Sequence, residues 1–166
     1  MSELTGRSIA FRPIRDGDEE FLYGVYASTR QEELAQTGWS EAQKTTFLRQ
    51  QFDAQSSYYR EHYRETSFDV ILADGRPIGR LYVARWPEQI RIVDIALLPE
   101  YRGAGVGTAL LRDLISESEA STKPLSIHVE RFNPALRLYE RLGFREVEDK
   151  GVYLLMQRAT GTGQLS

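Results

Sequence analysis

Residues 99–114 read PEYRGAGVGTALLRDL, a stretch that places Gly103, Gly105 and Gly107 directly before a run of leucines and charged residues. Glycine loses more conformational freedom on folding than any other residue. Glycines at alternate positions therefore indicate a backbone that turns sharply or closely approaches another molecule. The preceding residues read as a strand and the following ones as an amphipathic helix. In that context, free backbone N–H groups and the helix dipole form an anion-binding site.

Two familiar phosphate-binding loops do not fit this stretch. A P-loop requires Gly-Lys-Ser/Thr, whereas Gly107 is followed by Thr108 and Ala109. The dinucleotide-binding fingerprint requires a glycine at position 108 and a parallel βαβ unit before it, and the pattern offers neither. One phosphate-binding possibility is left, a loop whose consecutive amides from Gly103 to Thr108 wrap a pyrophosphate. A plain strand-to-helix turn is the alternative.

The composition narrows the classes of function. With 166 residues, 41% hydrophobic and 27% charged, the sequence predicts one domain over residues 1–158 and a flexible tail at 159–166. It contains no cysteine and two histidines, so we expect no disulfide, no cysteine nucleophile and no metal site. The net charge of -3 gives no general attraction to nucleic acid. No long apolar run or signal-peptide pattern is seen, so a cytoplasmic protein without a membrane partner is expected.

Capping patterns mark the helices of the N-terminal half, after a strand that alternation predicts over residues 9–14. Asp16 and Glu19 form a capping-box pattern before a short helix, and Ser40 and Gln43 form another before a long one. The C-terminal half is expected to contain, in chain order, two strands around a turn at Asp74-Gly75, strand 89–98, helix 105–120, strand 124–130, helix 133–143 and strand 151–158.

This order of elements predicts an α/β (α+β) domain with a mixed, mostly antiparallel sheet of about six or seven strands flanked by helices. The sheet is expected to become parallel where helices intervene between strands. Asn133 is a good helix N-cap, Pro134 suits the first helical position, and Gly143 suits a left-handed helix end.

Two blocks of the sequence resemble the GNAT superfamily of N-acetyltransferases. LLPEYRGAGVGTALL (97–111) is similar to the acyl-coenzyme A loop of that family. The loop signature Gln/Arg-x-x-Gly-x-Gly/Ala is matched by Arg102, Gly105 and Gly107. NPALRLYERLGF (133–144) is similar to the family's next block, which it matches at Asn133, Ala135, Tyr139, Gly143 and Phe144. The resemblance covers residues 70–158.

The resemblance implies the GNAT fold and transfer of an acetyl group from acetyl-CoA, the cosubstrate, to an amine. It implies that Arg102 contributes through its own amide more than its charge, with a solvated surface arginine as the alternative. Asn133 is implied to contact the pantetheine or phosphate region, with simple helix capping as the alternative. The amides implied to hold the pyrophosphate are those of Gly103, Ala104, Gly105, Val106, Gly107 and Thr108.

The same resemblance places Tyr139 at the position of the family's general acid. A phenol with a pKa near 10 is protonated at neutral pH and can donate its proton to a leaving thiolate. An ordinary core residue of an amphipathic helix is the alternative. The family's oxyanion donor is a backbone N–H at the end of the preceding strand, which here means Leu97 or Leu98, whose side chains are expected in the core.

A general base is less evident. Asp94 is the one carboxylate within RIVDIALL (91–98), where it would take the amine proton through water or anchor a cationic acceptor. An exposed charge on the sheet is the alternative. Glu130 is the second candidate, and His128 on its face is interpreted as a polar sheet residue. The family often transfers this proton through water without a dedicated base.

The acceptor is predicted to be a primary amine, and the acidic net charge favours a small cationic molecule. The alternatives are a protein N-terminus or lysine, a non-catalytic acyl-CoA sensor, and a structural domain without a ligand. Dimers are common in the family, but no interface is recognisable here. Aromatic residues of the variable region are expected either to line the acceptor pocket or to pack in the core: Trp39, Phe47, Phe52, Tyr58, Tyr59, Tyr63 and Trp86.

Overall fold

The computed structural model describes residues 2–4 and 7–161, so the predicted tail lies outside the described residues from 162 onward. The strands are β1 (Ser2–Leu4), β2 (Arg7–Pro13), β3 (Thr66–Ala73), β4 (Arg76–Arg85), β5 (Ile90–Leu97), β6 (Leu125–Glu130), β7 (Arg145–Asp149) and β8 (Tyr153–Arg158). The helices are α1 (Glu19–Ser28), α2 (Gln31–Ala35), α3 (Glu41–His62), α4 (Val106–Ser121) and α5 (Leu136–Arg141), with a 3₁₀ turn, η1, at Pro99–Tyr101. Of the helices described, none is both long and apolar enough to cross a membrane.

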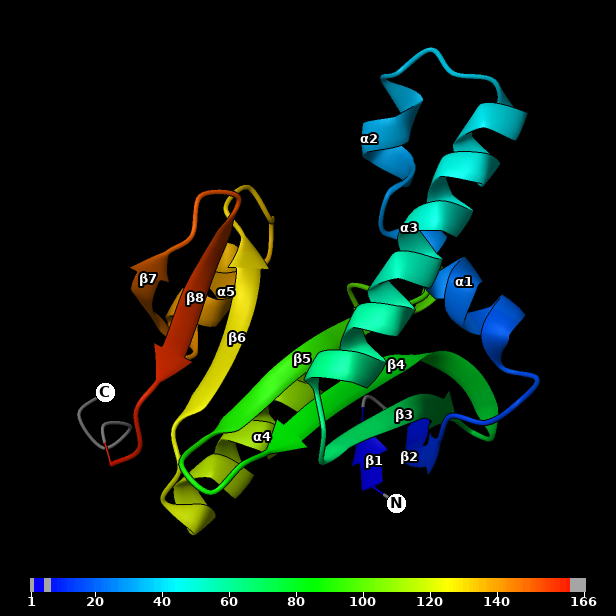
Figure 1. The fold of residues 1–166 in the computed structure, drawn as a ribbon. Helices are drawn as coiled ribbons and strands as arrows, with labels where there is room; N and C mark the ends of the chain where they lie inside the picture. Colours follow the sequence, from blue (N-terminus) through cyan, green and yellow to red (C-terminus); the bar gives the residue numbers. More distant parts are fainter. Residues whose placement is uncertain (1, 5–6, 162–166) are drawn as a thin grey trace.

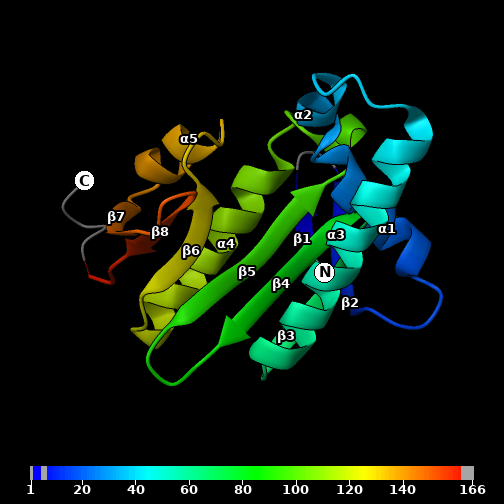
Figure 2. The same cartoon turned by 45° about the horizontal axis from the view of Figure 1, so that its top comes forward.

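One sheet separates two layers of helices. It runs in the order β1-β2-β3-β4-β5-β6-β8-β7 (Figure 1). Alternation along β3 sends Val70 and Leu72 toward the cluster formed with α1, α2 and α3. Ile71 and Ala73 face the opposite cluster, which holds the apolar side of α4. Figure 2 shows α3 and α4 on the two sides of the sheet.

The sheet is antiparallel except between β5 and β6, which confirms the predicted mixed, mostly antiparallel architecture. These two strands are parallel because α4 carries the chain back between them. The same expectation is wrong at α5. The chain forms β7 after that helix and then reverses into β8, so β8 lies antiparallel to β6.

Among the residues that the structure describes, the sheet has eight strands rather than the expected six or seven, because the short edge strands β1 and β7 extend it. All five residues of β7 (REVED) are exposed, so this strand carries no apolar alternation that would predict it. Strands of this kind are recognisable only by their pairing, here with β8.

Of the two predicted capping boxes, the one at Ser40 and Gln43 is confirmed in both directions. The one at Asp16 is wrong, since α1 begins after Asp18. The Asp18 carboxylate accepts two hydrogen bonds of 2.8 Å from the Arg12 guanidinium and one of 2.9 Å from the Arg15 amide. These bonds hold the pKa of Asp18 at about 2.

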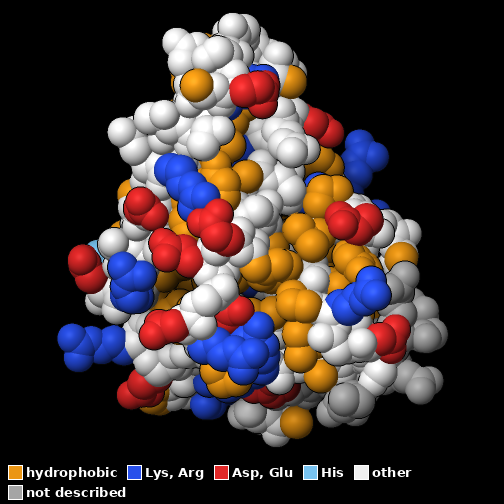
Figure 3. Space-filling view, turned by 90° about the vertical axis from the view of Figure 1, so that its right-hand side faces the viewer, with side chains coloured by type: hydrophobic (Ala, Val, Ile, Leu, Met, Phe, Trp, Pro, Cys, Tyr) orange, Lys and Arg blue, Asp and Glu red, His pale blue; other side chains and the backbone are white. Residues whose placement is uncertain are grey.

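Positive and negative charges are mixed on the face of the molecule that lies on the right-hand side in Figure 1. There, hydrophobic side chains gather in the middle of the surface, and basic and acidic side chains intermingle around them (Figure 3). Neither sign of charge dominates this face, in keeping with the small net charge of -3.

Candidate active site

Strands β5 and β6 pair only over Ile90–Ile92 and Leu125–Ile127. Beyond these residues the two ribbons diverge (Figure 1). In the part of the chain that the structure describes, residues 93–97 of β5 and 128–130 of β6 thus have no partner across the gap. We call this opening the splay. It exposes backbone groups of β5 between the two helix layers.

The glycine-rich loop lies at the end of β5 beside the splay. Gly103 and Gly105 have φ of 75° and 87°, conformations that side chains rarely tolerate. The first helical hydrogen bond of α4 runs from the amide of Ala109 to the carbonyl of Gly105. Among the described residues, the amides of 103–108 donate no hydrogen bond, so they remain free for an anion at this helix N-terminus.

Arg102 is engaged differently from the expectation. Its amide donates to the carbonyl of Pro99 at 3.1 Å, so it is not free to bind a cofactor. Its Nε donates to the carbonyl of Leu97 at 2.9 Å, and its Nη2 donates to Ser28 Oγ at 2.9 Å. The guanidinium therefore ties the loop to the end of β5 and to the end of α1, on a residue that remains exposed to solvent.

The two candidate oxyanion donors are now distinguishable. The amide of Leu98 donates to the carbonyl of Ile78 in β4 at 2.8 Å, so the expectation that it is available is wrong. Successive amides of a strand point to opposite sides, so the N–H of Leu97 is directed toward the splay. The side chain of Leu97 is buried, as predicted.

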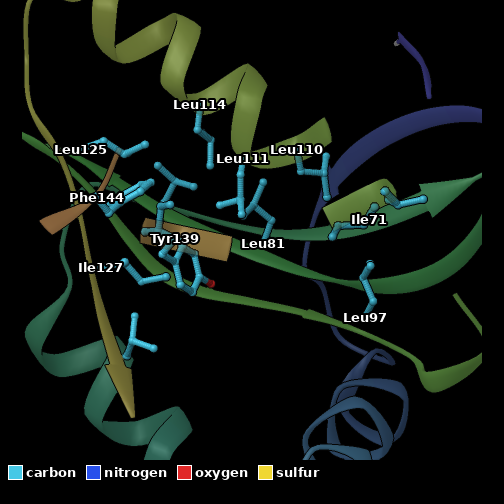
Figure 4. Packing of buried hydrophobic residues seen from close by; sticks show 14 of the residues in the cluster. Ile71, Leu81, Leu97, Leu110, Leu111, Leu114, Leu125, Ile127, Tyr139 and Phe144 are labelled. Carbon is cyan, nitrogen blue, oxygen red and sulfur yellow. The ribbon is translucent and has the colours of Figure 1, made fainter. Parts of the chain in front are cut away.

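Tyr139 projects from α5 into the core beside the splay. Its ring packs edge-on against Phe144, with centroids 5.6 Å apart, and the side chain is buried. Figure 4 shows the hydroxyl directed away from the Phe144 ring. Burial, followed by the charge of Asp94, raises the pKa of Tyr139 to about 12. Within the described chain this hydroxyl makes no hydrogen bond, so it remains available as a donor.

Asp94 lies on β5 where the splay opens, on the sheet face that α3 covers. Its Oδ2 accepts from Arg80 Nη2 at 2.6 Å and from the Tyr59 hydroxyl at 3.1 Å. The Asp94 side chain is 15% exposed and that of Arg80 only 4%. Asp94 is thus half of a buried ion pair, which excludes the alternative of an exposed sheet charge. For Oδ1 of Asp94, the described residues supply no hydrogen-bond partner.

Glu130 and Asn133 lie at the other lip of the splay, after the paired part of β6. The Glu130 carboxylate is 3.2 Å from Arg30 Nη1 and 42% exposed, so it forms a surface ion pair. The Asn133 side chain accepts from the amide of Ala135 at 2.8 Å, in a turn that precedes the helix. The prediction that Asn133 caps the helix and that Pro134 takes its first position is wrong, because α5 begins at Leu136 and its N-cap residue is Ala135, without a side-chain cap. Gly143 has φ of 100° and ends α5 as expected.

The predicted aromatic set divides into separate groups. Phe52 belongs to the core against α1, and Trp39 packs edge-on against Phe47. Tyr63 stacks on Trp86 at the far end of β5 from the glycine-rich loop, where an open hollow of about 440 Å³ lies. Only Tyr59 reaches the splay, through its hydrogen bond to Asp94.

Arg80, which forms the ion pair with Asp94, was not predicted from the sequence. Its one signal was a lone cation within the apolar strand stretch IGRLYV (78–83). Arg80 pairs opposite Val70 across β3 and β4, so its side chain enters the face covered by α3. His128 was interpreted as a polar sheet residue, and its Nδ1 lies 3.4 Å from Arg91 Nη1.

Comparisons with known proteins fit this geometry. A model of the acetyltransferase (GNAT) family matches residues 27–144. The chain is 29% identical over 108 residues to an N-alpha-acetyltransferase of Sulfurisphaera tokodaii, covering 55% of this chain and 65%, slightly under two thirds, of that protein. It is 27% identical over 161 residues to streptothricin acetyltransferase of Streptomyces lavendulae, covering 87% of this chain and 85% of that one.

The fold is similar to the crystal structure of PaiA N-acetyltransferase from Thermoplasma acidophilum in complex with coenzyme A. The TM-score is 0.68 at 19% identity, and the match covers 92% of this chain and 99% of that one. At this level of identity the likeness concerns the fold alone.

Proposed function

Because the chain belongs to the GNAT acetyltransferase family, we propose that it transfers the acetyl group of acetyl-CoA to the primary amine of a small molecule, by direct attack in a ternary complex. The observation that carries the proposal is the run of free amides from Gly103 to Thr108, which lies at the end of β5 beside Tyr139 and the splay. We assign the domain to residues 1–158 and the protein to the cytoplasm.

The residues of the loop fit the pyrophosphate of coenzyme A. Free amides at a helix N-terminus attract an anion, and glycines leave room for it to approach the backbone. The amides of Gly103, Ala104, Gly105, Val106, Gly107 and Thr108 would hold the pyrophosphate, with Asn133 contributing from the other lip of the splay. Bound acetyl-CoA supplies an activated acetyl group in the form of a thioester.

Three groups of the chain then serve the transfer. Asp94 Oδ1 takes one proton from the acceptor ammonium, directly or through water, and returns it to solvent. The Leu97 N–H donates to the thioester oxygen as negative charge develops there. As the new N–C bond forms and the C–S bond breaks, Tyr139 gives its proton to the departing sulfur. The second proton lost by the nitrogen restores Tyr139.

Glu130 is the weaker candidate for the base. It is ion-paired with Arg30 at the surface and lies on the opposite lip of the splay from Asp94. A base must reach the amine that attacks, and a carboxylate occupied by a guanidinium at the rim is less suited to this than Asp94 Oδ1.

The acceptor class rests on two observations. The net charge of -3 favours a cationic small molecule. The match to streptothricin acetyltransferase, whose name denotes a small-molecule acceptor, spans most of both chains. A protein N-terminus is the second candidate, which the N-alpha-acetyltransferase relative favours.

The test measures thiol release from acetyl-CoA with a panel of amines and with peptides that have free N-termini. Turnover of small amines at a higher kcat/KM than peptides supports the proposal, and the reverse order supports the second candidate. Acetyl-CoA binding without turnover of any acceptor supports a sensor and refutes the proposal. Activity of Asp94→Asn equal to the natural protein across the pH range removes Asp94 from the scheme.

A further inference from the structure

Arg80 is the one residue of the described chain with a buried side-chain nitrogen or oxygen that lacks a hydrogen-bond partner. The atom is Nε, and the whole residue is 3% exposed. Nη2 carries two bonds, to Asp94 Oδ2 at 2.6 Å and to Gln55 Oε1 at 3.0 Å. Leaving a donor of a guanidinium buried and unpaired is costly, so its presence calls for an explanation other than packing.

Stability does not supply that explanation. A buried ion pair loses in desolvation much of what it gains from attraction, and apolar residues of similar volume often stabilise a core equally well. The place of the Arg80–Asp94 pair in the fold does explain why Arg80 is buried. Asp94 is the only carboxylate on β5 and lies where the splay opens. Asp94 Oδ2 is held from two sides, while Oδ1 has no partner among the described residues.

We propose that Arg80 is a positioning residue of the transfer reaction: its buried guanidinium fixes Oδ2 of Asp94 and so leaves Oδ1 to receive the proton of the acceptor amine. The inference rests on the proposed acetyl transfer. Arg80 touches neither substrate in this scheme and acts only through Asp94. The planar fork of arginine fixes a carboxylate better than the single ammonium of lysine.

Groups from each element packed around Asp94 face its carboxylate. Arg80 from β4 is the neighbouring cation, Tyr59 from α3 donates to Asp94, and Tyr82 lies opposite Asp94 on β4. Tyr139 from α5 lies within electrostatic reach of Asp94. The three tyrosines all have a pKa raised by burial, so at neutral pH Arg80 is the one charged partner in this set.

The test compares Arg80→Met and Arg80→Lys with the matched variant Arg85→Met. Arg85 lies on the same strand but is paired with Glu117 at the surface. Without the guanidinium that fixes Oδ2, the Asp94 carboxylate loses its orientation toward the acceptor, so kcat falls by at least about tenfold in Arg80→Met while the KM for the acceptor changes by less than about twofold. We expect a smaller loss of kcat in Arg80→Lys and none in Arg85→Met, with the Kd for acetyl-CoA within about twofold in all three.

Two further measurements separate positioning from a purely structural role. In the Asp94→Asn background, Arg80→Met should cause no additional loss of kcat, because its effect passes through Asp94. The carboxyl ¹³C signal of Asp94, compared at neutral pH between the natural protein and Arg80→Lys, reads the contact with Arg80 without any acceptor, so it remains informative if acetyl transfer itself fails. A lower kcat accompanied by an equal rise of the acceptor KM, or an unchanged Asp94 carboxyl signal, overturns the inference, as does full additivity of the two substitutions.

Discussion

Removal of one oxygen atom from Tyr139 tests the proposed acid most cleanly. In Tyr139→Phe the ring keeps its edge-on contact with Phe144, because the contact involves only ring carbons. The lost hydroxyl has no partner in the described chain, so the substitution leaves no buried polar atom unpaired. The free energy of unfolding should therefore change by less than about 1 kcal/mol.

Turnover should respond much more strongly than stability. A positioned general acid contributes a factor of 10² to 10⁴, so kcat should fall by at least about a hundredfold, or about 2.7 kcal/mol of activation free energy. The assay is thiol release at saturating acetyl-CoA, with Kd for acetyl-CoA measured by calorimetry in parallel. Tyr58→Phe, at an exposed position of α3, is the matched control and should change neither quantity.

The same variant carries a signature in alkaline unfolding. Tyr139 has a pKa of about 12 in the folded protein, above the value near 10 of an unfolded chain. Its contribution to stability is therefore complete below pH 10 and is lost as the pH rises toward 12, and Tyr139→Phe should lack that part of the loss. Equal kcat in Tyr139→Phe and the natural protein would refute the assignment of Tyr139 as the acid.

Other substitutions test the fold through the free energy of unfolding, measured by denaturant titration. Asp18→Asn should lower the free energy of unfolding by about 2 kcal/mol at neutral pH, because the pKa of Asp18 lies near 2 in the ion pair with Arg12. In the natural protein this stabilisation is present above pH 4 and is lost as the pH falls toward 2. A free energy of unfolding that does not change between pH 4 and pH 2 would contradict this. Gly79→Ala should lower the free energy of unfolding by more than about 3 kcal/mol, because its Cβ would lie 2.2 Å from the carbonyl oxygen of Ala96, and native-like stability would contradict this close approach of β4 and β5. Gly24 lies on α1, and a Cβ added there would meet nothing within 4 Å outside the backbone of its own helix. Gly24→Ala should therefore raise the free energy of unfolding by about 0.5–1 kcal/mol, and a decrease would contradict the helical conformation at this position.

Signals that lie within a few residues of one another were predictable from the sequence. The glycine-rich loop, the capping box at Ser40 and the left-handed end at Gly143 all depend on local backbone geometry, and the structure confirms each of them. The order of apolar stretches was also sufficient to predict the mixed sheet and the parallel pairing of the two strands that α4 connects. Local sequence patterns were therefore sufficient to predict the architecture and the loop beside the splay.

Relations between distant residues were not predictable. Asp94 was singled out, but Arg80 and Tyr59, which hold it, come from another strand and from α3, and only the folded chain brings them together. The use of the Leu98 amide depends on pairing with β4. The helix α1 begins after Asp18 rather than after Asp16, because the side chain of Arg12 on β2 forms an ion pair with Asp18. In each case a tertiary partner decided between local options.

The most direct measurement is calorimetric titration of acetyl-CoA into the natural protein, Gly105→Glu and Gly75→Glu. Both glycines have positive φ, 87° and 82°, so the two variants carry similar backbone strain, but Gly75 lies in the β3–β4 turn. We expect binding by the natural protein and by Gly75→Glu, with a Kd at least about a hundredfold higher in Gly105→Glu, or about 2.7 kcal/mol. Failure of the natural protein to bind, or equal binding by Gly105→Glu, would contradict the claim that the amides of this loop hold coenzyme A.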